Sequence, residues 1–168
     1  MKKQILQGIL FFIIPVMLLS ILSPGCSTSR QAQTPATPEE IAAAINSNSW
    51  LFIARNANPQ YGRSRYLTDR YEVRLRNDSL QVNLPYFGRA YAGAGYPGSQ
   101  PVLDFSSTRF NLDKKGEKQG QWLVMIKPAD YSEVQSMTFT LQETGNAQVN
   151  ILLTNRSAIS FTGTIAPQ

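Results

Sequence analysis

The sequence lacks side chains on which most hydrolases and many metalloenzymes depend. Its 168 residues include no histidine, and its one cysteine is Cys26. Serine–histidine–aspartate triads, cysteine–histidine pairs and histidine-based zinc sites are therefore excluded. The Gly-Ala-Gly run at residues 93–95 lacks the spacing and the strand–helix setting of a phosphate-binding loop. We therefore expect no metal and no cofactor, and we predict that the protein is not an enzyme.

Three acidic residues are the remaining candidates for catalysis. Asp104, Asp130 and Glu133 lie near the ends of predicted strands. Glycoside hydrolysis needs two carboxyl groups about 5 to 10 Å apart in a cleft. Asp130 follows Pro128 in a predicted turn and Glu133 precedes a strand, so turn and surface roles also explain these acids. A carboxylate-based hydrolase of envelope glycans is therefore an alternative to a protein that binds its partner without catalysis.

The segment from Pro85 to Pro101 is rich in aromatic residues and glycine, and it is long for a connection between strands. Aromatic faces beside an arginine can stack on sugars, hold a peptide or contact lipid headgroups. We predict a ligand or partner surface here, or alternatively a plug at one end of the barrel made by the first two aromatic residues. The candidate residues are Tyr86, Phe87, Arg89, Tyr91 and Tyr96.

A second candidate surface is basic. Arginines crowd residues 55–76 and alternate with tyrosines, a composition that suits an anionic envelope polymer. The alternative is an ordinary solvated strand face, because two of these arginines fall on the polar side of their strand. The candidate basic patch consists of Arg63, Arg65, Arg74 and Arg76.

The amino-terminal residues predict how the chain is exported. Residues 1–25 have the basic start, apolar stretch and small final residue of a secretory signal peptide. The stretch Ile5–Leu22 is close to the length of a membrane-spanning helix, which is the competing interpretation. Residues 21–26 (Ile-Leu-Ser-Pro-Gly-Cys) resemble a lipobox, so we predict cleavage before Cys26 and attachment of lipid to its thiol. Two or three acyl chains anchor a protein stably to a membrane.

Residues 26–37 are polar and contain one charge, which predicts a lipidated tether. No acidic residue directly follows Cys26, so we expect an outer-membrane lipoprotein on the periplasmic face, with the cell surface as the other location. Removing Lys2 and Lys3 lowers the net charge from +5 to about +3. We therefore predict a non-enzymatic envelope lipoprotein that binds a small apolar ligand, a protein or an anionic glycan; nucleic acid is not expected. A purely structural envelope protein is a further alternative.

Residues 38–168 predict a single all-β domain. Thr37, Pro38 and Glu40 begin a short helix with a capping box, and residues 46–48 end it. From Trp50 onward, apolar and polar residues alternate between turn signals, which favours an antiparallel up-and-down, lipocalin-like barrel of about eight strands over a sandwich. The predicted strands are 50–54, 71–76, 79–84, 102–106, 108–112, 121–127, 136–142, 147–153 and 158–165, with a charged turn over 114–120.

Three segments carry a family resemblance. They are Arg-Asn-Ala-Asn-Pro at 55–59, Leu-Pro-Tyr-Phe-Gly-Arg-Ala-Tyr at 84–91 and Asn-Arg-Ser-Ala-Ile-Ser-Phe-Thr-Gly at 155–163. Together with the lipobox and the short helix, they resemble a family of small Bacteroidota lipoproteins that contain a domain of unknown function. The resemblance implies a lipocalin-like β-barrel in an envelope protein and supplies no catalytic residue.

Overall fold

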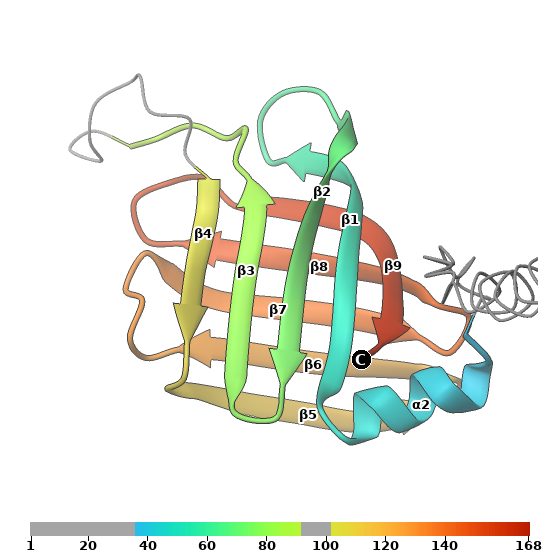
Figure 1. Cartoon of the computed structure of the whole chain (residues 1–168). Coiled ribbons are helices and arrows are strands. Elements are labelled where there is room, and N and C mark those ends of the chain that lie inside the picture. The colour runs from blue at the N-terminus through green and yellow to red at the C-terminus, as the bar shows by residue number, and fades with distance from the viewer. Residues whose placement is uncertain (1–35, 92–101) are drawn as a thin grey trace, which may run out of the picture. The chain divides into compact units, whose positions relative to one another are not determined.

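The computed structural model describes residues 36–91 and 102–168 (Figure 1). The predicted signal peptide, Cys26, most of the tether and Tyr96 lie outside these residues. The described residues form one short helix and nine strands, so the predicted all-β fold is confirmed. The elements are α2 (Pro38–Asn46), β1 (Ser49–Pro59), β2 (Arg65–Arg76), β3 (Ser79–Pro85), β4 (Val102–Ser107), β5 (Phe110–Lys118), β6 (Gln121–Pro128), β7 (Val134–Gln142), β8 (Asn146–Leu153) and β9 (Ile159–Pro167).

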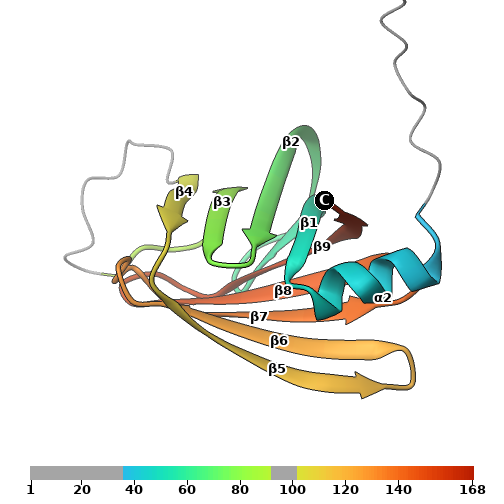
Figure 2. The same cartoon turned by 60° about the horizontal axis from the view of Figure 1, so that its bottom comes forward.

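All nine strands belong to one antiparallel sheet in the order β4-β3-β2-β1-β9-β8-β7-β6-β5. Neighbours in the sheet are neighbours in the chain except at β1 and β9, which join the two halves. In Figure 1 the strands β1 to β4 cross in front of β5 to β8, and β9 bends from the rear layer into the front one. Figure 2 shows the two layers from another side. The predicted up-and-down barrel is therefore confirmed as a nearly closed sheet with nine strands, whose free edges are β4 and β5.

Strand β1 contains a bulge where it pairs with β9. The register shifts between Ala54 and Asn56, so that Arg55 is the extra residue in this pairing, whereas in the pairing with β2 the excess residues are 67–70 of β2. A bulge of this kind increases the local bend and twist of a strand. Opposite it in β9, a Cβ atom on Gly163 would clash with the backbone carbonyl of Ile53. The two backbones therefore approach each other closely because Gly163 has no side chain.

Aromatic side chains fill the space between the two layers. Trp50 and Phe52 from β1 meet Phe139 from β7 edge to face, with ring centroids 4.9 and 6.0 Å apart. All three side chains are fully buried. Edge-to-face pairs add about 0.5–1.5 kcal/mol beyond the burial of apolar area. The front and rear layers thus contact each other directly through these rings.

Helix α2 lies against the sheet as the sequence predicts. Thr37 accepts a hydrogen bond from the backbone N–H of Glu40, whose carboxylate accepts one from the backbone N–H of Thr37. The buried residues Ile41, Ala44 and Ile45 face the core. At the other end, the Lys114 Nζ donates to the carbonyls of Ile45 and Asn46 and to the Asn48 Oδ1, at 2.8–3.0 Å. The lysine charge also complements the negative end of the helix dipole.

Several predicted strand boundaries were wrong. The predicted charged turn over 114–120 is the second half of β5, because an exposed edge strand tolerates lysines, and the turn itself is confined to residues 119–120. Strand β1 continues past the predicted end at Ala54 because the Arg55 bulge interrupts the alternation without ending the strand. Strand β2 begins at Arg65, six residues before its predicted start, where its side chains are mostly exposed.

The described elements fall within one structural unit, residues 34–168. In the portions of the chain that the structure describes, no helix has the length and apolar content needed to cross a bilayer.

Candidate functional site

Tyr86 and Ser157 join the segment after β3 to the turn between β8 and β9. The buried Tyr86 hydroxyl lies 2.8 Å from the carbonyl oxygen of Ser157, 3.1 Å from its Oγ and 3.1 Å from the carbonyl oxygen of Arg89. The Arg89 N–H donates to the Ser157 Oγ, and the Ser157 N–H donates to the Arg89 carbonyl. We call these contacts the Tyr86–Ser157 latch. Burial raises the pKa of the Tyr86 hydroxyl above 10.0, which keeps it protonated as a donor.

Gly88 makes room for the latch. A Cβ atom at this position would clash with the Tyr86 hydroxyl and lie 2.6 Å from the Ser157 Oγ. Two of the segments that carry the family resemblance, 84–91 and 155–163, therefore contact each other in the folded protein.

Residues 86–89 also take part in three arginine–aromatic pairs. The Arg65 guanidinium carbon lies 4.7 Å from the centroid of Phe87, that of Arg89 lies 5.2 Å from Tyr61, and that of Arg156 lies 5.4 Å from Tyr86. Each pair has one member in the segment 86–89, so the three guanidinium groups share one region of the surface. We call this region the arginine–aromatic rim, and its members are Tyr61, Arg65, Tyr86, Phe87, Arg89 and Arg156.

The rim lies at one end of the front layer. In Figure 1 the loop between β1 and β2 and the segment that follows β3 are at the same end of these strands. Tyr61 and Tyr91 are about half exposed, at 48% and 52%. Among residues 36–91 and 102–168, no carboxylate forms an ion pair with Arg65 or Arg89, whereas Arg156 lies 3.9 Å from the exposed Glu133. The rim thus combines one half-exposed aromatic ring, that of Tyr61, with an excess of positive charge, and Tyr91 lies next to its segment 86–89 in the chain.

The predicted ligand surface in the segment 85–101 divides into two parts. Tyr86 is buried in the latch and Phe87 is half-buried under Arg65, and both pack with the core. Arg89 and Tyr91 are exposed at the rim, and the Tyr91 N–H donates to the carbonyl of Asn155. Tyr96 belongs to the part of this segment that the structure does not describe.

The predicted basic patch is not a single surface. Arg65 begins β2 opposite Ala57 and Arg76 ends it opposite Ser49, so roughly 25 Å of β1 separates them. Arg65 belongs to the rim, and Arg63 lies two residues before it in the loop between β1 and β2. Both side chains are exposed. Arg74 pairs with Glu72 at 2.7 Å, and Arg76 donates to the side chain of Gln168. The prediction failed because a strand carries its first and last residues to opposite ends of the layer.

The three candidate acids have separate local contacts. Asp130 accepts hydrogen bonds from the Ser107 hydroxyl and the Thr108 N–H, and the first of these holds the pKa of its carboxyl below 3.8. Glu133 lies beside Arg156, as described above. Asp104 is exposed on the outer face of β4. In the described ranges, no cluster of three or more acidic or cysteine side chains could hold a metal ion.

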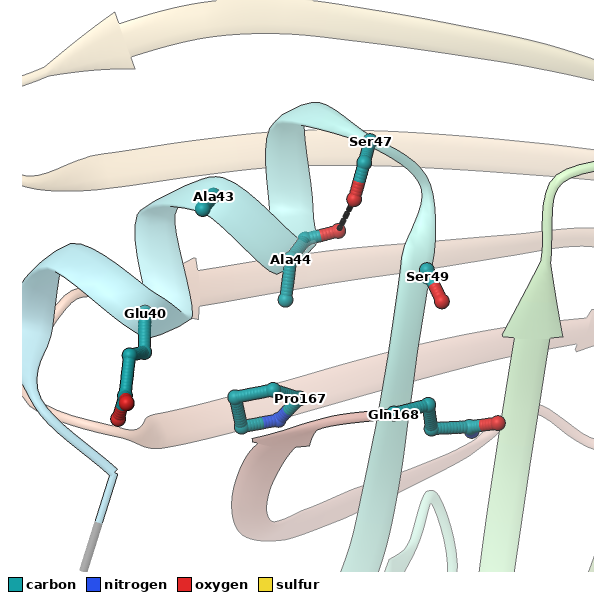
Figure 3. Close-up of a pocket in the computed structure, with 7 residues that line it drawn as sticks. All are labelled: Glu40, Ala43, Ala44, Ser47, Ser49, Pro167 and Gln168. Atoms are coloured by element: carbon teal, nitrogen blue, oxygen red, sulfur yellow. Dashed lines mark hydrogen bonds between the residues drawn. The ribbon is translucent and has the colours of Figure 1, made fainter.

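Two hollows lined by described residues contain no member of the rim. The larger, of about 490 Å³, is an open groove between α2 and the end of β9. Figure 3 shows its lining, which consists mainly of small side chains, with the Ser47 hydroxyl donating to the Ala44 carbonyl at 3.2 Å. The smaller hollow, of about 190 Å³, lies on the outer face of β2, β3 and β4 and has a mostly polar lining.

Sequence reasoning missed two members of the rim. Arg156 enters the sequence-based predictions only within the family segment 155–163, and Tyr61 only within the arginine-rich stretch 55–76. Both join the rim because β1 pairs with β9, which brings the ends of distant segments together. A pattern of alternating residues within one strand contains no signal for such a contact.

The sequence model of a family described as "Domain of unknown function (DUF4251)" matches residues 32–165. The chain belongs to the DUF4251 family. The resemblance to a Bacteroidota family of unknown function is thereby confirmed. No curated protein sequence matches this DUF4251 chain. Its fold is similar to the crystal structure of a DUF4251 family protein from Bacteroides eggerthii DSM 20697, with a TM-score of 0.54 and 16% identity, over 77% of this chain and 87% of that one.

Proposed function

We propose that this DUF4251 protein is a non-enzymatic envelope lipoprotein that binds an anionic glycan at the arginine–aromatic rim. The observation that carries the proposal is the stacking of three arginines on aromatic rings around one short segment. A guanidinium held over a ring keeps its N–H donors at its edge, where they can bind a carboxylate or phosphate with two hydrogen bonds. The half-exposed Tyr61 and Tyr91 add aromatic faces on which a sugar ring can stack.

A surface site has more support than a ligand inside the barrel. The contact of Trp50 and Phe52 with Phe139 occupies the space between the layers where an apolar ligand would otherwise lie.

A hydrolase also has less support than a binding protein. Asp130 is held by its turn and Glu133 faces an arginine, so both have local structural contacts. These contacts favour binding without catalysis.

The location remains the one that the amino-terminal sequence predicts. Lipid on Cys26 would hold the domain at the outer membrane on its periplasmic face, and residues 27–37 would serve as the tether. Mass spectrometry of protein purified from its host should find a diacylglycerol group on an amino-terminal Cys26. Replacing Cys26 with alanine should release the protein to the soluble fraction. An unmodified cysteine in a chain that still contains residues 1–25 would refute the lipid anchor.

Glycan binding can be tested with polygalacturonate, which carries one carboxylate per sugar, and with neutral dextran. The full chain in detergent should bind polygalacturonate but not dextran, and the affinity should fall as salt concentration rises. The double variant Arg65→Gln/Arg89→Gln should lose at least about tenfold in affinity, the effect of roughly two weakened charge-assisted hydrogen bonds. The matched control is Arg76→Gln/Arg109→Gln, which removes the same charge outside the rim.

Comparing the two double variants distinguishes binding at the rim from attraction that depends only on the net charge of the protein. A loss confined to the rim variant supports the proposal. Equal losses in both double variants would show that only net charge matters. Equal binding of dextran and polygalacturonate would refute the proposal that the ligand is an anionic glycan.

A further inference from the structure

We infer that the hollow on the outer face of β2, β3 and β4 is a second binding site, which takes one neutral sugar ring. The hollow shares no residue with the arginine–aromatic rim and the inference does not rest on the proposed function. Its volume is about 190 Å³, and six of its eight lining residues are polar: Glu72, Arg74, Gln81, Asn83, Asp104 and Ser106. The other two, Val82 and Phe105, are buried residues of the core.

The sheet register arranges these polar side chains in two rows. Glu72 pairs with Asn83, which pairs with Asp104 on the next strand. Two residues away along the strands, Arg74 pairs with Gln81, which pairs with Ser106. Since alternate residues of a strand share a face, both rows point outward, with about 4.8 Å between strands. The result is a platform of closely spaced hydrogen-bonding groups on three neighbouring strands.

The platform offers donors and acceptors with little net charge. The Glu72 carboxylate is shared between Arg70 at 2.8 Å and Arg74 at 2.7 Å, which neutralises it. Asp104 contributes an acceptor, whereas the two amides of Gln81 and Asn83 each offer both donors and acceptors. A hydroxyl group is likewise both donor and acceptor, so a ligand with several hydroxyls can satisfy all of these groups. An anion would face Asp104 without a free cation beside it.

The size of the hollow also limits its ligand. Its volume is below the ~300 Å³ at which pockets for drug-sized ligands begin, which favours a ligand of one small ring.

The experiment uses nuclear magnetic resonance on the isotope-labelled full chain in detergent. D-Glucose, D-galactose, D-mannose and N-acetyl-D-glucosamine are titrated separately, and the side-chain amide signals of Gln81 and Asn83 are followed. At least one sugar should shift both signals in a saturable way with a millimolar dissociation constant. Asn83→Ala should weaken that binding about tenfold, because it removes hydrogen bonds at the centre of the platform. Asn83 is exposed and lies outside the core, so the variant should keep its fold.

Two controls keep the result specific. Asn150→Ala removes an exposed asparagine from β8, in the other layer, and should leave sugar binding unchanged. Arg65→Gln/Arg89→Gln should also leave it unchanged, which separates this site from the rim. If none of the four sugars shifts the two amide signals, or if Asn83→Ala and Asn150→Ala bind equally well, the inference is wrong.

Discussion

The Tyr86–Ser157 latch predicts a large effect from the loss of one oxygen atom. In Tyr86→Phe the ring remains, but the carbonyl and hydroxyl of Ser157, a fully buried residue, lose the phenol as their partner. A buried hydrogen bond contributes about 1 kcal/mol net, and leaving a buried partner unsatisfied raises the cost to about 1–3 kcal/mol. We therefore expect the free energy of unfolding to fall by roughly 2 kcal/mol. In a domain of this size, that corresponds to a decrease in melting temperature of roughly 5–10 °C.

Urea unfolding of the full chain in detergent measures this change directly. Trp50 and Trp122 are both buried, so their fluorescence reports unfolding of the core. The matched control is Tyr66→Phe, which removes the same atom from a side chain that is 70% exposed and should change stability by less than about 0.5 kcal/mol. Ser157→Ala should also be destabilising, and the double variant should lose less than the sum of the two single losses. Equal stability of the Tyr86→Phe and Tyr66→Phe proteins would refute the reasoning.

Three further predictions concern stability. Lys114→Met removes three hydrogen bonds to the end of α2 and should cost about 1–2 kcal/mol in urea unfolding, whereas Lys115→Met, on the exposed side of the same strand, should be neutral. Gly163→Ala places a methyl group against the backbone of β1 and should cost about 1–3 kcal/mol, whereas Gly116→Ala meets no atom within 4 Å; equal melting temperatures would contradict the close approach. Because the pKa of Asp130 is depressed in the folded state, its contribution is present above pH 3.8 and is lost as the pH falls through its lower folded value. The stability difference between wild type and Asp130→Asn should therefore shrink below pH 3.8, and a constant difference would contradict this assignment.

Local sequence signals predicted the elements whose structure depends on neighbouring residues. The helix start at Thr37 and Pro38 was predicted correctly because a capping box is complete within four residues. The hairpin of β2 and β3 was predicted because its alternation and its turn at residues 77–78 are contiguous. Strand β5 was assigned too short, since its lysines resemble a turn when the position of the strand at the sheet edge is unknown.

The candidate site was predicted less completely because it depends on contacts between distant segments. Arg89 and Tyr91 were identified from the composition of their own segment, and both are exposed at or beside the rim. Arg156 and Tyr61 were missed because their partners lie far away in the chain. Tyr86 is aromatic and near an arginine, as a ligand-binding residue would be, but its ring is buried and its hydroxyl contacts Ser157. No pattern within the segment 84–91 indicates this partner.

The pairing of β1 with β9 also determines the order in which the chain can fold. Trp50 lies opposite Pro167, so the first strand of the domain obtains its second partner only when the last strand is present. Contacts between residues so distant in the chain slow folding, because the intervening loop must close before the contacts form. A chain that is still emerging from a ribosome therefore lacks the strand that joins its two halves. Folding of the complete sheet is postponed until β9 has been synthesised.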